Sequence, residues 1–514
     1  MLLHPTSLPG SQGVGTLDGA CLLFLDFLQS AGMSWWQVCP LGPTGYGDSP
    51  YQCFSAFAGN PYLIDLRDLA SRGLLTHEEI APLASRGAGA ADFGALYEIK
   101  APLLRRAFGR HRRAGSPALG PEEFAQFKAA QAAWLDDYAW FRALKDRHGG
   151  RAWWEWPEGA RSPSMLKAGL RAQLREEMEA HQFYQYAFFS QWRRVRSEAA
   201  RRGIGVIGDI PIFVAADSAD AWARPGLFEL GGDGRPVAVA GVPPDYFSSD
   251  GQLWGNPLYR WEAHKADGYA WWKDRLRASF AINDAVRIDH FRGFDEYWRI
   301  PLPASNARAG EWRKGPGLDF FRAMSAEFPG ARIIAEDLGI LTPTVAMLLR
   351  ETGLPGMAVL QFAFDGDATN PYLPHNLRPN EVVYPGTHDN DTTLGWYATA
   401  GEPTRDHVRR YLRVGGTEVG WDFIRAAYGA VSRIAVVPMQ DILSLGSEGR
   451  LNSPGRPEGN WRWRMAEGDL RRLAAGETPS YLAELARLYG RDVPARSAPA
   501  RESPAGIETG NAKG

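Results

Sequence analysis

Short apolar or β-branched runs that end abruptly in polar residues recur along the chain, a pattern typical of buried β-strands. Segments long enough for helices separate them. We predict eight strands, at Leu2–His4, Trp35–Cys39, Gly205–Ile210, Ala285–Ile288, Arg332–Ala335, Met357–Phe362, Glu381–Tyr384 and Ile434–Met439. Eight strands with helical connections favour the α/β class and a closed parallel (β/α)8 TIM barrel. An open doubly wound sheet is the alternative, although no glycine-rich dinucleotide turn follows the first strand.

The segment from residue 66 to 203 is too long for a simple connection between two strands. It is rich in Ala, Arg, Leu and Glu, and Thr76 with Glu79 forms a capping box before an apolar pattern. Apolar residues at i+4 spacing from Leu166 to Met178 would share one helix face. The aromatic stretch Phe183–Trp192 is expected in the core. We therefore predict an inserted, mainly helical subdomain.

The remaining segments complete the predicted domain organisation. Residues 215–280 are expected to form a loop insertion, and nothing after Met439 resembles a C-terminal β-sandwich domain. Residues 495–514 contain Ser, Pro, Ala, Gly and charged residues with little to bury, so we expect a disordered tail. The sequence thus predicts one catalytic barrel over residues 1–494.

Composition excludes several classes of protein. Of 514 residues, 45% are hydrophobic, and 57 basic against 59 acidic side chains give a net charge of −2, which disfavours a nucleic-acid or lipid binder. No apolar run approaches the roughly 18 residues that cross a bilayer, and no signal peptide is apparent, so a cytoplasmic protein is expected. Three cysteines cannot form a fully paired disulfide framework, and no Cys/His cluster indicates a zinc site.

Carboxylates recur where predicted strands end. Asp209, Asp289, Glu336 and Asp389 each follow or end an apolar run, or lie in the polar segment just after one. A single aspartate in such a place is commonly a loop or helix cap. Because the C-terminal ends of barrel strands form the active face, we expect Asp289, Glu336 and Asp389 to converge from three different strands.

Converging carboxylates can cleave a glycosidic bond with retention of configuration, since that reaction uses a nucleophile and a proton donor. Arg287 lies two residues before Asp289, so both side chains would point to the same side of an extended strand, and the cation would keep Asp289 ionised. Glu336, without an adjacent arginine, is the better proton donor. A divalent-metal site for phosphoryl transfer is the competing interpretation, although no phosphate-binding glycine-rich loop accompanies the acids.

Aromatic residues in Pro/Gly-rich segments favour a sugar substrate. The chain has 19 tryptophans. Tyr46 and Tyr51 lie in one such segment, and Tyr246, Phe247 and Trp254 lie in another, beside Asp and Asn residues. Aromatic rings cover the apolar faces of sugars while polar groups bind their hydroxyls.

Seven short blocks then give a resemblance to a known family. They are Leu3–Gly10, Ser49–Gln52, Ser55–Pro61, Gly208–Ile212, Arg287–Gly293, Ala335–Gly339 and Gly386–Asn390. In this order they closely resemble the 4-α-glucanotransferases, also called amylomaltases or disproportionating enzymes, which are relatives of the α-amylases. The resemblance extends from Leu2 to about Pro494.

The resemblance implies a (β/α)8 barrel with inserted subdomains that transfers α-1,4-glucan segments to glucose or a maltooligosaccharide by a retaining mechanism. It implies no cofactor and no obligate protein partner. Asp289 is then similar to the nucleophile, Glu336 to the general acid/base, and Asp389 to the residue that stabilises the sugar at the transition state. The block around Asp209 lacks the Asn-His pair of amylases, so no structural calcium is expected.

Other residues acquire binding roles from the same resemblance. Arg287 and His388 would contact the scissile glucose, with Asp209 supporting the same pocket. Further implied glucan contacts are Asp245, Tyr246, Phe247 and Trp254 in a mobile loop over the acceptor sites, Tyr51 and Tyr97 as aromatic guides for long glucans, Asp365, and Asn452 in a second loop across the cleft. Two other functions stay open, an α-glucan hydrolase of the amylase type and a non-catalytic glucan-binding protein.

Overall fold

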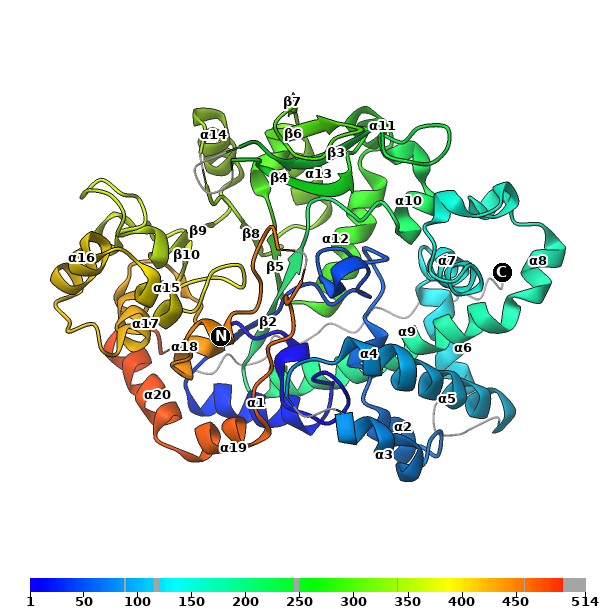
Figure 1. Cartoon of the computed structure of the whole chain (residues 1–514), viewed down its shortest axis with the longest axis horizontal. Helices are drawn as coiled ribbons and strands as arrows, with labels where there is room; N and C mark the ends of the chain where they lie inside the picture. The colour runs from blue at the N-terminus through cyan, green and yellow to red at the C-terminus, as the bar shows by residue number, and fades with distance from the viewer. Residues whose placement is uncertain (87–88, 115–119, 245–248, 340, 457, 493–514) are drawn as a thin grey trace, which may run out of the picture.

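The computed structural model describes residues 1–86, 89–114, 120–244, 249–339, 341–456 and 458–492. Parallel strands lie in the middle of the molecule, helices surround them, and a separate antiparallel sheet lies at the top of the view in Figure 1. The cyan helices α5–α9 lie on one side, and α15–α17 lie on the other. The α/β class predicted from the strand and helix pattern is confirmed.

The parallel strands form two sheets, with the orders β1-β2-β5-β8 and β11-β10-β9. They are β1 (Trp35–Gln37), β2 (Gly205–Ile210), β5 (Ala285–Ile288), β8 (Ile333–Ala335), β9 (Gly356–Val359), β10 (Glu381–Tyr384) and β11 (Ile434–Ala435). Strands β5, β8, β9 and β10 are buried along their whole length. Burial on both faces explains why these strands are continuous apolar runs rather than alternating ones.

The predicted strand positions are confirmed for β2, β5 and β10, whose bounds match. Strands β1, β8, β9 and β11 differ by a few residues from the predicted runs. The first predicted strand, Leu2–His4, is wrong as a regular strand, because Pro5 begins a 3-10 turn over Pro5–Ser7. Leu2 nevertheless makes isolated parallel bridges with Gln37 and with Pro438.

The Leu2 segment connects the outer strands of the two sheets. The amide of Leu2 donates to the carbonyl of Val437, 2.8 Å away, and the amide of Leu3 donates to the carbonyl of Gln37 at 3.1 Å. Val437 follows β11 and Gln37 ends β1. Hydrogen bonds therefore run from β11 through Leu2 to β1.

A buried carboxylate links the other two outer strands, β8 and β9. The amide of Ala335 donates to the carbonyl of Pro355 at 2.9 Å, and the next contact is made by a side chain, since the amide of Met357 donates to Asp337 Oδ1 at 2.7 Å. A Cβ on Gly356 would lie 2.5 Å from Asp337 Oδ2. Gly356 thus leaves the room in which Asp337 replaces a backbone acceptor.

Helices follow most strands and account for the long insertion. They are α1 (Gly19–Ser30), α2 (Leu66–Ser71), α3 (His77–Arg86), α4 (Phe93–Ala95), α5 (Ala101–Ala114), α6 (Pro121–Ala130), α7 (Leu135–Arg147), α8 (Ala168–Gln173), α9 (Arg175–Arg201), α10 (Ala219–Ala223), α11 (Trp261–Ala266), α12 (Ala270–Ile282), α13 (Gly317–Glu327), α14 (Pro343–Thr352), α15 (Thr393–Thr399), α16 (Glu402–Leu412), α17 (Val419–Gly429), α18 (Met439–Ile442), α19 (Glu467–Ala475) and α20 (Thr478–Leu488).

Helices α2–α9 lie within residues 66–203, as the apolar pattern predicts. The capping box is present, since the amide of Thr76 donates to Glu79 Oε2 and the amide of Glu79 donates to Thr76 Oγ1. The aromatic residues of Phe183–Trp192 are largely buried in α9. The single helix face expected from Leu166 to Met178 is interrupted, because the chain leaves helical geometry at Leu174, between α8 and α9.

The segment 215–280, predicted as a loop insertion, contains helices α10–α12 and two strands of an antiparallel sheet with the order β4-β3-β6-β7. Its strands are β3 (Ala238–Val242), β4 (Gln252–Pro257), β6 (Glu296–Pro301) and β7 (Glu311–Lys314). Trp254 therefore lies in a strand and not in a loop. Gly and Pro in β4 are residues typical of loops, so the sequence does not indicate a strand there. The sheet is stabilised by the pairing of β3 with β4 and with β6, and the β3–β6 pairing joins segments far apart in the sequence.

Beyond β11, the described chain forms helices α18–α20. The predicted tail, residues 495–514, lies outside the described residues, and the boundaries of the barrel domain and its insertions stay predictions. Within the described ranges, every helix is too short or too polar to span a lipid bilayer.

Gly59, in the block Ser55–Pro61, provides a test of packing against α9. Its amide and carbonyl both pair with the buried side chain of Gln185, and a Cβ would lie 2.0 Å from Phe188 Cδ1. We expect Gly59→Ala to lower the free energy of unfolding by about 1–3 kcal/mol, because the ring and backbone have to shift. Urea unfolding measures the change. In the control Gly169→Ala, on α8, the new methyl group meets no atom within 4 Å, and an equal loss there would contradict the explanation.

Candidate active site

A buried ion pair on two neighbouring strands forms the base of the site. Asp209 on β2 and Arg287 on β5 are partners in the strand register, so their side chains project to the same side. Arg287 Nη1 donates to both carboxylate oxygens of Asp209, at 3.0 and 2.7 Å, and only 4% and 1% of the two side chains are exposed. Burial alone would lower the pKa of Arg287, but the charges of Asp209 and Asp289 raise it well above its usual value. The guanidinium is therefore a permanent cation.

Asp289 follows β5 directly and extends the strand pairing, since its amide donates to the carbonyl of Ile210 at 2.9 Å. Its Oδ1 lies 3.0 Å from Arg287 Nη1. The side chain is 28% exposed, in contrast to Asp209 and Arg287 beneath it. One cation thus holds a buried carboxylate and a solvent-accessible one, and this contact orients Asp289.

Glu336 lies at the equivalent position after β8, on the other side of Arg287's strand. Its Oε2 accepts from the amide of His290 at 2.6 Å and its Oε1 from the amide of Leu338 at 2.9 Å. His290 has a left-handed backbone, with φ 52°, which presents its amide to the carboxylate. Burial raises the pKa of Glu336 to about 7, and the charge of Asp289 adds to this effect while Arg287 opposes it. A glutamate with this pKa can both donate and accept a proton near neutrality.

Asp389 and His388 lie in the loop after β10, opposite Glu336. His388 Nε2 is 3.3 Å from Asp389 Oδ2, and Asn452 Nδ2 donates to Asp389 Oδ1 at 2.6 Å. Burial disfavours the anion, but the His388 charge and these hydrogen bonds lower the pKa of Asp389 to about 2. Burial opposes protonation of His388, yet the charge and hydrogen bond of Asp389 raise the pKa of the imidazole. The pair is therefore carboxylate and imidazolium.

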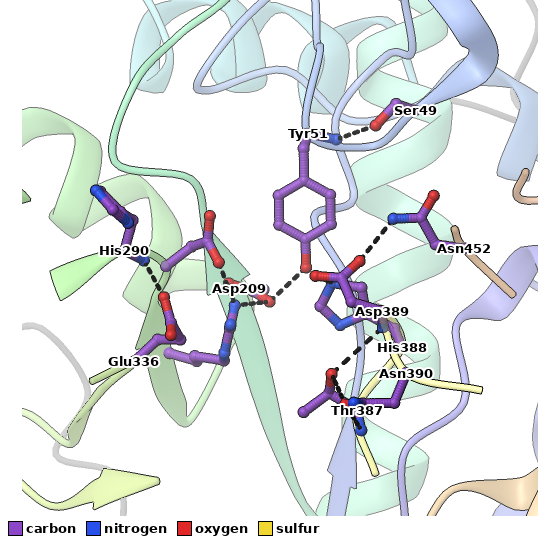
Figure 2. A network of polar contacts seen from close by, with 12 residues as sticks. Ser49, Tyr51, Asp209, His290, Glu336, Thr387, His388, Asp389, Asn390 and Asn452 are labelled. Atoms are coloured by element: carbon purple, nitrogen blue, oxygen red, sulfur yellow. Dashed lines mark hydrogen bonds and ion pairs between the residues drawn. The ribbon is translucent and has the colours of Figure 1, made fainter. Parts of the chain in front are cut away.

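Tyr51 connects the two halves of the site. Its hydroxyl donates to Asp209 Oδ2 at 2.7 Å, and its ring is stacked on His388 with centroids 5.1 Å apart. Figure 2 shows Asp209 in the middle, with Glu336 and His290 on one side and Tyr51, His388 and Asp389 on the other. Tyr51 thus links the Asp209–Arg287–Asp289 group to the His388–Asp389 pair.

Trp254 lies beside this group. Its ring meets that of His290 edge to face, with centroids 4.8 Å apart. Gln52, in the loop that carries Tyr51, donates to the carbonyl of Trp254 at 3.2 Å and to Asn256 Oδ1 at 2.8 Å. Strand β4 of the antiparallel sheet is therefore attached to the site from two directions.

The predicted site residues separate into three groups. The structure brings together those at the strand ends and in the loops after them, namely Asp209, Arg287, Asp289, Glu336, His388, Asp389, Tyr51, Asn452 and, through His290, Trp254. Tyr97 is 51% exposed and packs on Tyr62, and Asp365 is exposed and accepts from Asn370, so both contact residues outside this group. Asp245, Tyr246 and Phe247 lie outside the described residues.

Several residues of the site could not be assigned from the sequence. Arg450 donates through Nη2 to the carbonyl of Asp389 at 2.9 Å and through Nε to the carbonyl of Asn452 at 2.8 Å, so it fixes the loop across Asp389. Met357 Sδ accepts from Arg287 Nε at 3.3 Å. Trp461, in contrast, belongs with Asn452 to the loop that the family resemblance predicts across the cleft, and its ring packs on Tyr51 and His388. The sequence signal for Arg450 is its position two residues before Asn452, a predicted glucan contact.

The arrangement allows acid/base and nucleophilic chemistry at one point. Asp289 is an oriented anion, Glu336 carries a proton near neutrality, and Arg287 and His388 supply the positive charges that balance the acids. Within the part of the chain that the structure describes, no group of three or more His, Cys, Asp or Glu side chains is placed to hold a metal ion.

Known sequences match the chain over almost its full length. Residues 3–470 fit a family model described as 4-alpha-glucanotransferase. A 4-alpha-glucanotransferase of Thermus thermophilus is 51% identical over 480 residues, which cover 91% of this chain and 95% of that protein. The corresponding protein of Synechocystis is 45% identical and covers 96% of this chain and 98% of its own length.

Solved structures agree with the sequence matches. An amylomaltase from Streptococcus agalactiae in complex with acarbose superimposes with a TM-score of 0.90 at 36% identity, covering 95% of this chain and 98% of that one. An amylomaltase from Corynebacterium glutamicum, 18% identical with a TM-score of 0.76, covers 94% of this chain and 74% of that one and shares the fold. The family model, the identities and the fold agree, and the chain belongs to the 4-alpha-glucanotransferase family.

Proposed function

We propose that this protein transfers segments of α-1,4-glucans from a donor chain to the 4-hydroxyl of glucose or of another glucan. One observation carries the proposal. The Arg287 guanidinium holds Asp289 as an exposed anion while Glu336, on the adjacent strand end, has a pKa of about 7 because of burial. A fixed carboxylate beside a protonated one is the pair that retaining glycoside chemistry requires.

The scaffold of the proposed enzyme is a closed (β/α)8 barrel. Seven parallel strands and the Leu2 segment would be its eight strand positions. The hydrogen bonds of Leu2 and of Asp337 would close the barrel where the two sheets meet. In such a barrel, Asp209, Asp289, Glu336 and Asp389 all lie at the C-terminal ends of strands, where active sites of this architecture form. The helical segment 66–203 and the segment 215–280 are insertions into this single catalytic unit.

The first step breaks the donor. A carboxylate oxygen of Asp289 attacks the anomeric carbon, the bond from that carbon to the leaving 4-oxygen breaks, and the proton of Glu336 passes to that oxygen. The product is a glucosyl ester on Asp289 with inverted configuration. Asp389, kept anionic by His388 and Asn452, stabilises the positive charge that develops on the sugar.

The second step repeats the chemistry in reverse. Glu336, now a carboxylate, takes the proton of an acceptor hydroxyl, whose oxygen attacks the anomeric carbon and displaces Asp289. Two inversions restore the α configuration. Transfer prevails over hydrolysis when the acceptor is bound and oriented better than water, which is far more concentrated. Trp254, packed against His290 next to Glu336, is our candidate for an acceptor contact.

The low exposure of the remaining charged side chains indicates supporting roles beneath the reacting groups. Asp209 and Arg287 are buried and act from beneath, as counter-ions that fix Asp289. His388 is buried against Tyr51 and holds Asp389. Tyr97 and Asp365 stay predicted glucan contacts, and a cytoplasmic location, with no protein partner required, stays a prediction.

The products formed from pure maltotriose test the proposed function. We expect glucose together with a series of longer maltooligosaccharides, with no net gain of reducing ends, because each bond that is broken is replaced by a new one. Chromatography of the products and a reducing-sugar assay measure this. Only shorter sugars with rising reducing ends would mean an α-glucan hydrolase, and unchanged maltotriose would indicate a non-catalytic binding protein.

Substitution of the two reacting carboxylates tests their roles. We expect Asp289→Asn and Glu336→Gln each to lower kcat on maltotriose by about 10²–10⁴ or more. A maltosyl fluoride donor, whose leaving group needs no proton, should let Glu336→Gln form a glucosyl ester that is detected by mass spectrometry, whereas Asp289→Asn forms none. The control is Asp337→Asn, at the neighbouring buried carboxylate that binds the amide of Met357. An ester in Asp289→Asn would refute the assignment.

The pH dependence tests the proton donor. Because Glu336 has to be protonated for the first step, and burial raises its pKa to about 7, we expect kcat/KM for maltotriose to fall as the pH rises through about 7. With maltosyl fluoride the same plot should lose this alkaline limb, since the leaving group needs no proton. Stopped-flow or initial-rate measurements on both donors decide. Identical alkaline limbs for the two donors would contradict the role of Glu336.

A further inference from the structure

A small internal cavity lies behind His388. Its volume is about 20 Å³, and its lining includes His4, Ser7, His388 and Gln440. A polar cavity of this size holds one water molecule when at least two polar groups face it. The cavity is formed by residues 2–7, by the loop after β10 and by parts of residues 438–451, so it lies between the N-terminus and the site.

Two buried polar atoms of the first block face this cavity without a protein partner. His4 is 4% exposed and Ser7 is fully buried, and neither His4 Nδ1 nor Ser7 Oγ has a hydrogen-bond partner among the residues that the structure describes. An unpaired buried polar group costs about 1–3 kcal/mol, so two of them in one cavity require a ligand.

The backbone of the block brings these two side chains together. Pro5 begins the 3-10 turn, in which the amide of Ser7 donates to the carbonyl of His4 at 2.9 Å. The turn is packed closely from outside, because a Cβ on Gly15 would lie 2.1 Å from the carbonyl oxygen of Pro5. The turn is therefore rigid, and it brings the side chains of His4 and Ser7 to the same cavity.

His388 faces the same cavity from the other side. Its Nε2 is paired with Asp389, and the same ring lines the cavity. Burial, together with the charge of His388, lowers the pKa of His4 to about 3, so His4 is neutral and its Nδ1 can accept a hydrogen bond. The His388 imidazolium, in contrast, has an N–H to donate at Nδ1.

We propose that one water molecule is bound in this cavity by His4 Nδ1, Ser7 Oγ and His388 Nδ1, and that His4 and Ser7 are positioning residues for His388. The water accepts from His388 and donates to His4 and to Ser7. The inference rests on the proposed function, in which His388 holds Asp389 for catalysis. It gives a role to the Leu3–Gly10 block, which the proposed mechanism leaves unexplained.

The consequence concerns the orientation of the imidazolium. Stacking on Tyr51 fixes the plane of the His388 ring but allows the 180° flip about the Cβ–Cγ bond, which exchanges Nδ1 with Cδ2 and Nε2 with Cε1. The hydrogen bond through the water fixes Nδ1, and therefore fixes Nε2 opposite Asp389. Loss of the water would let Asp389 lose its partner while the fold stays unchanged.

The first experiment is a high-resolution crystal structure of the unaltered chain, together with 15N spectra of its imidazoles. We expect a water peak within hydrogen-bond distance of His4 Nδ1, Ser7 Oγ and His388 Nδ1, and an Nδ1 signal of His388 typical of a hydrogen-bonded imidazolium. An empty cavity, or a His388 Nδ1 bonded to a protein group, would overturn the proposal. Neither readout depends on activity.

The second experiment compares two variants of equal size. His4→Leu removes the acceptor, and we expect kcat on maltotriose to fall about tenfold with a smaller change in KM, as for loss of one buried hydrogen bond. His4→Asn places an amide where Nδ1 was, and we expect it to restore kcat to within about threefold of the unaltered enzyme. The control is His111→Leu in α5, at another buried histidine whose Nδ1 is unpaired, and it should leave kcat unchanged.

The outcomes separate this inference from the proposed function. Equal kcat values for His4→Leu and the unaltered enzyme, with the water present, would refute the positioning role. Equal losses in His4→Asn and His4→Leu would show that size and not hydrogen bonding matters, which also refutes it. An unaltered enzyme that does not transfer glucan would refute the proposed function, and the water peak and the His388 signal would still decide the inference.

Discussion

The buried guanidinium of Arg287 constrains the rest of the site. A cation in the protein interior has to be paired, since an uncompensated buried charge costs several kcal/mol. Asp209 supplies that pairing from the adjacent position in the strand register, and Asp289 shares the same nitrogen. The ion pair therefore orients Asp289, the proposed nucleophile, and ties β2 to β5 at the level of the site. Any shift of strand register would separate the partners.

The environments of the acids, rather than the acids themselves, assign their roles. Glu336 is desolvated, and the two backbone amides that donate to it offset only part of this effect, so its pKa rises to about 7. The Asp389 side chain is 43% exposed, and its partners His388 and Asn452 lower its pKa to about 2. Pushing the pKa values of neighbouring carboxylates apart is how one site obtains an acid and an anion at the same pH.

The sequence predicts the half of the site that lies on the strands. Apolar runs locate β2, β5 and β10, because buried strands leave a continuous signal, and Asp289, the proposed nucleophile, directly follows β5. The aromatic, Pro/Gly-rich segment indicates Tyr51, whereas Asn452 is predicted only by the resemblance. Arg450 and the antiparallel sheet were missed, since the contacts that define them join segments far apart in sequence and leave no local periodicity.

The two halves of the site are held in different ways, and this difference bears on the reaction. Asp289 and Glu336 extend a hydrogen-bonded strand ladder, so the backbone fixes the distance between the proposed nucleophile and the proposed acid. Asp389 is 43% exposed on a loop and is fixed by side chains from distant segments, including Asn452. Bond exchange needs constant geometry at the reacting carbon, which the ladder provides. The chains on either side of that carbon vary in length, and a half built from loops can admit them without disturbing the ladder.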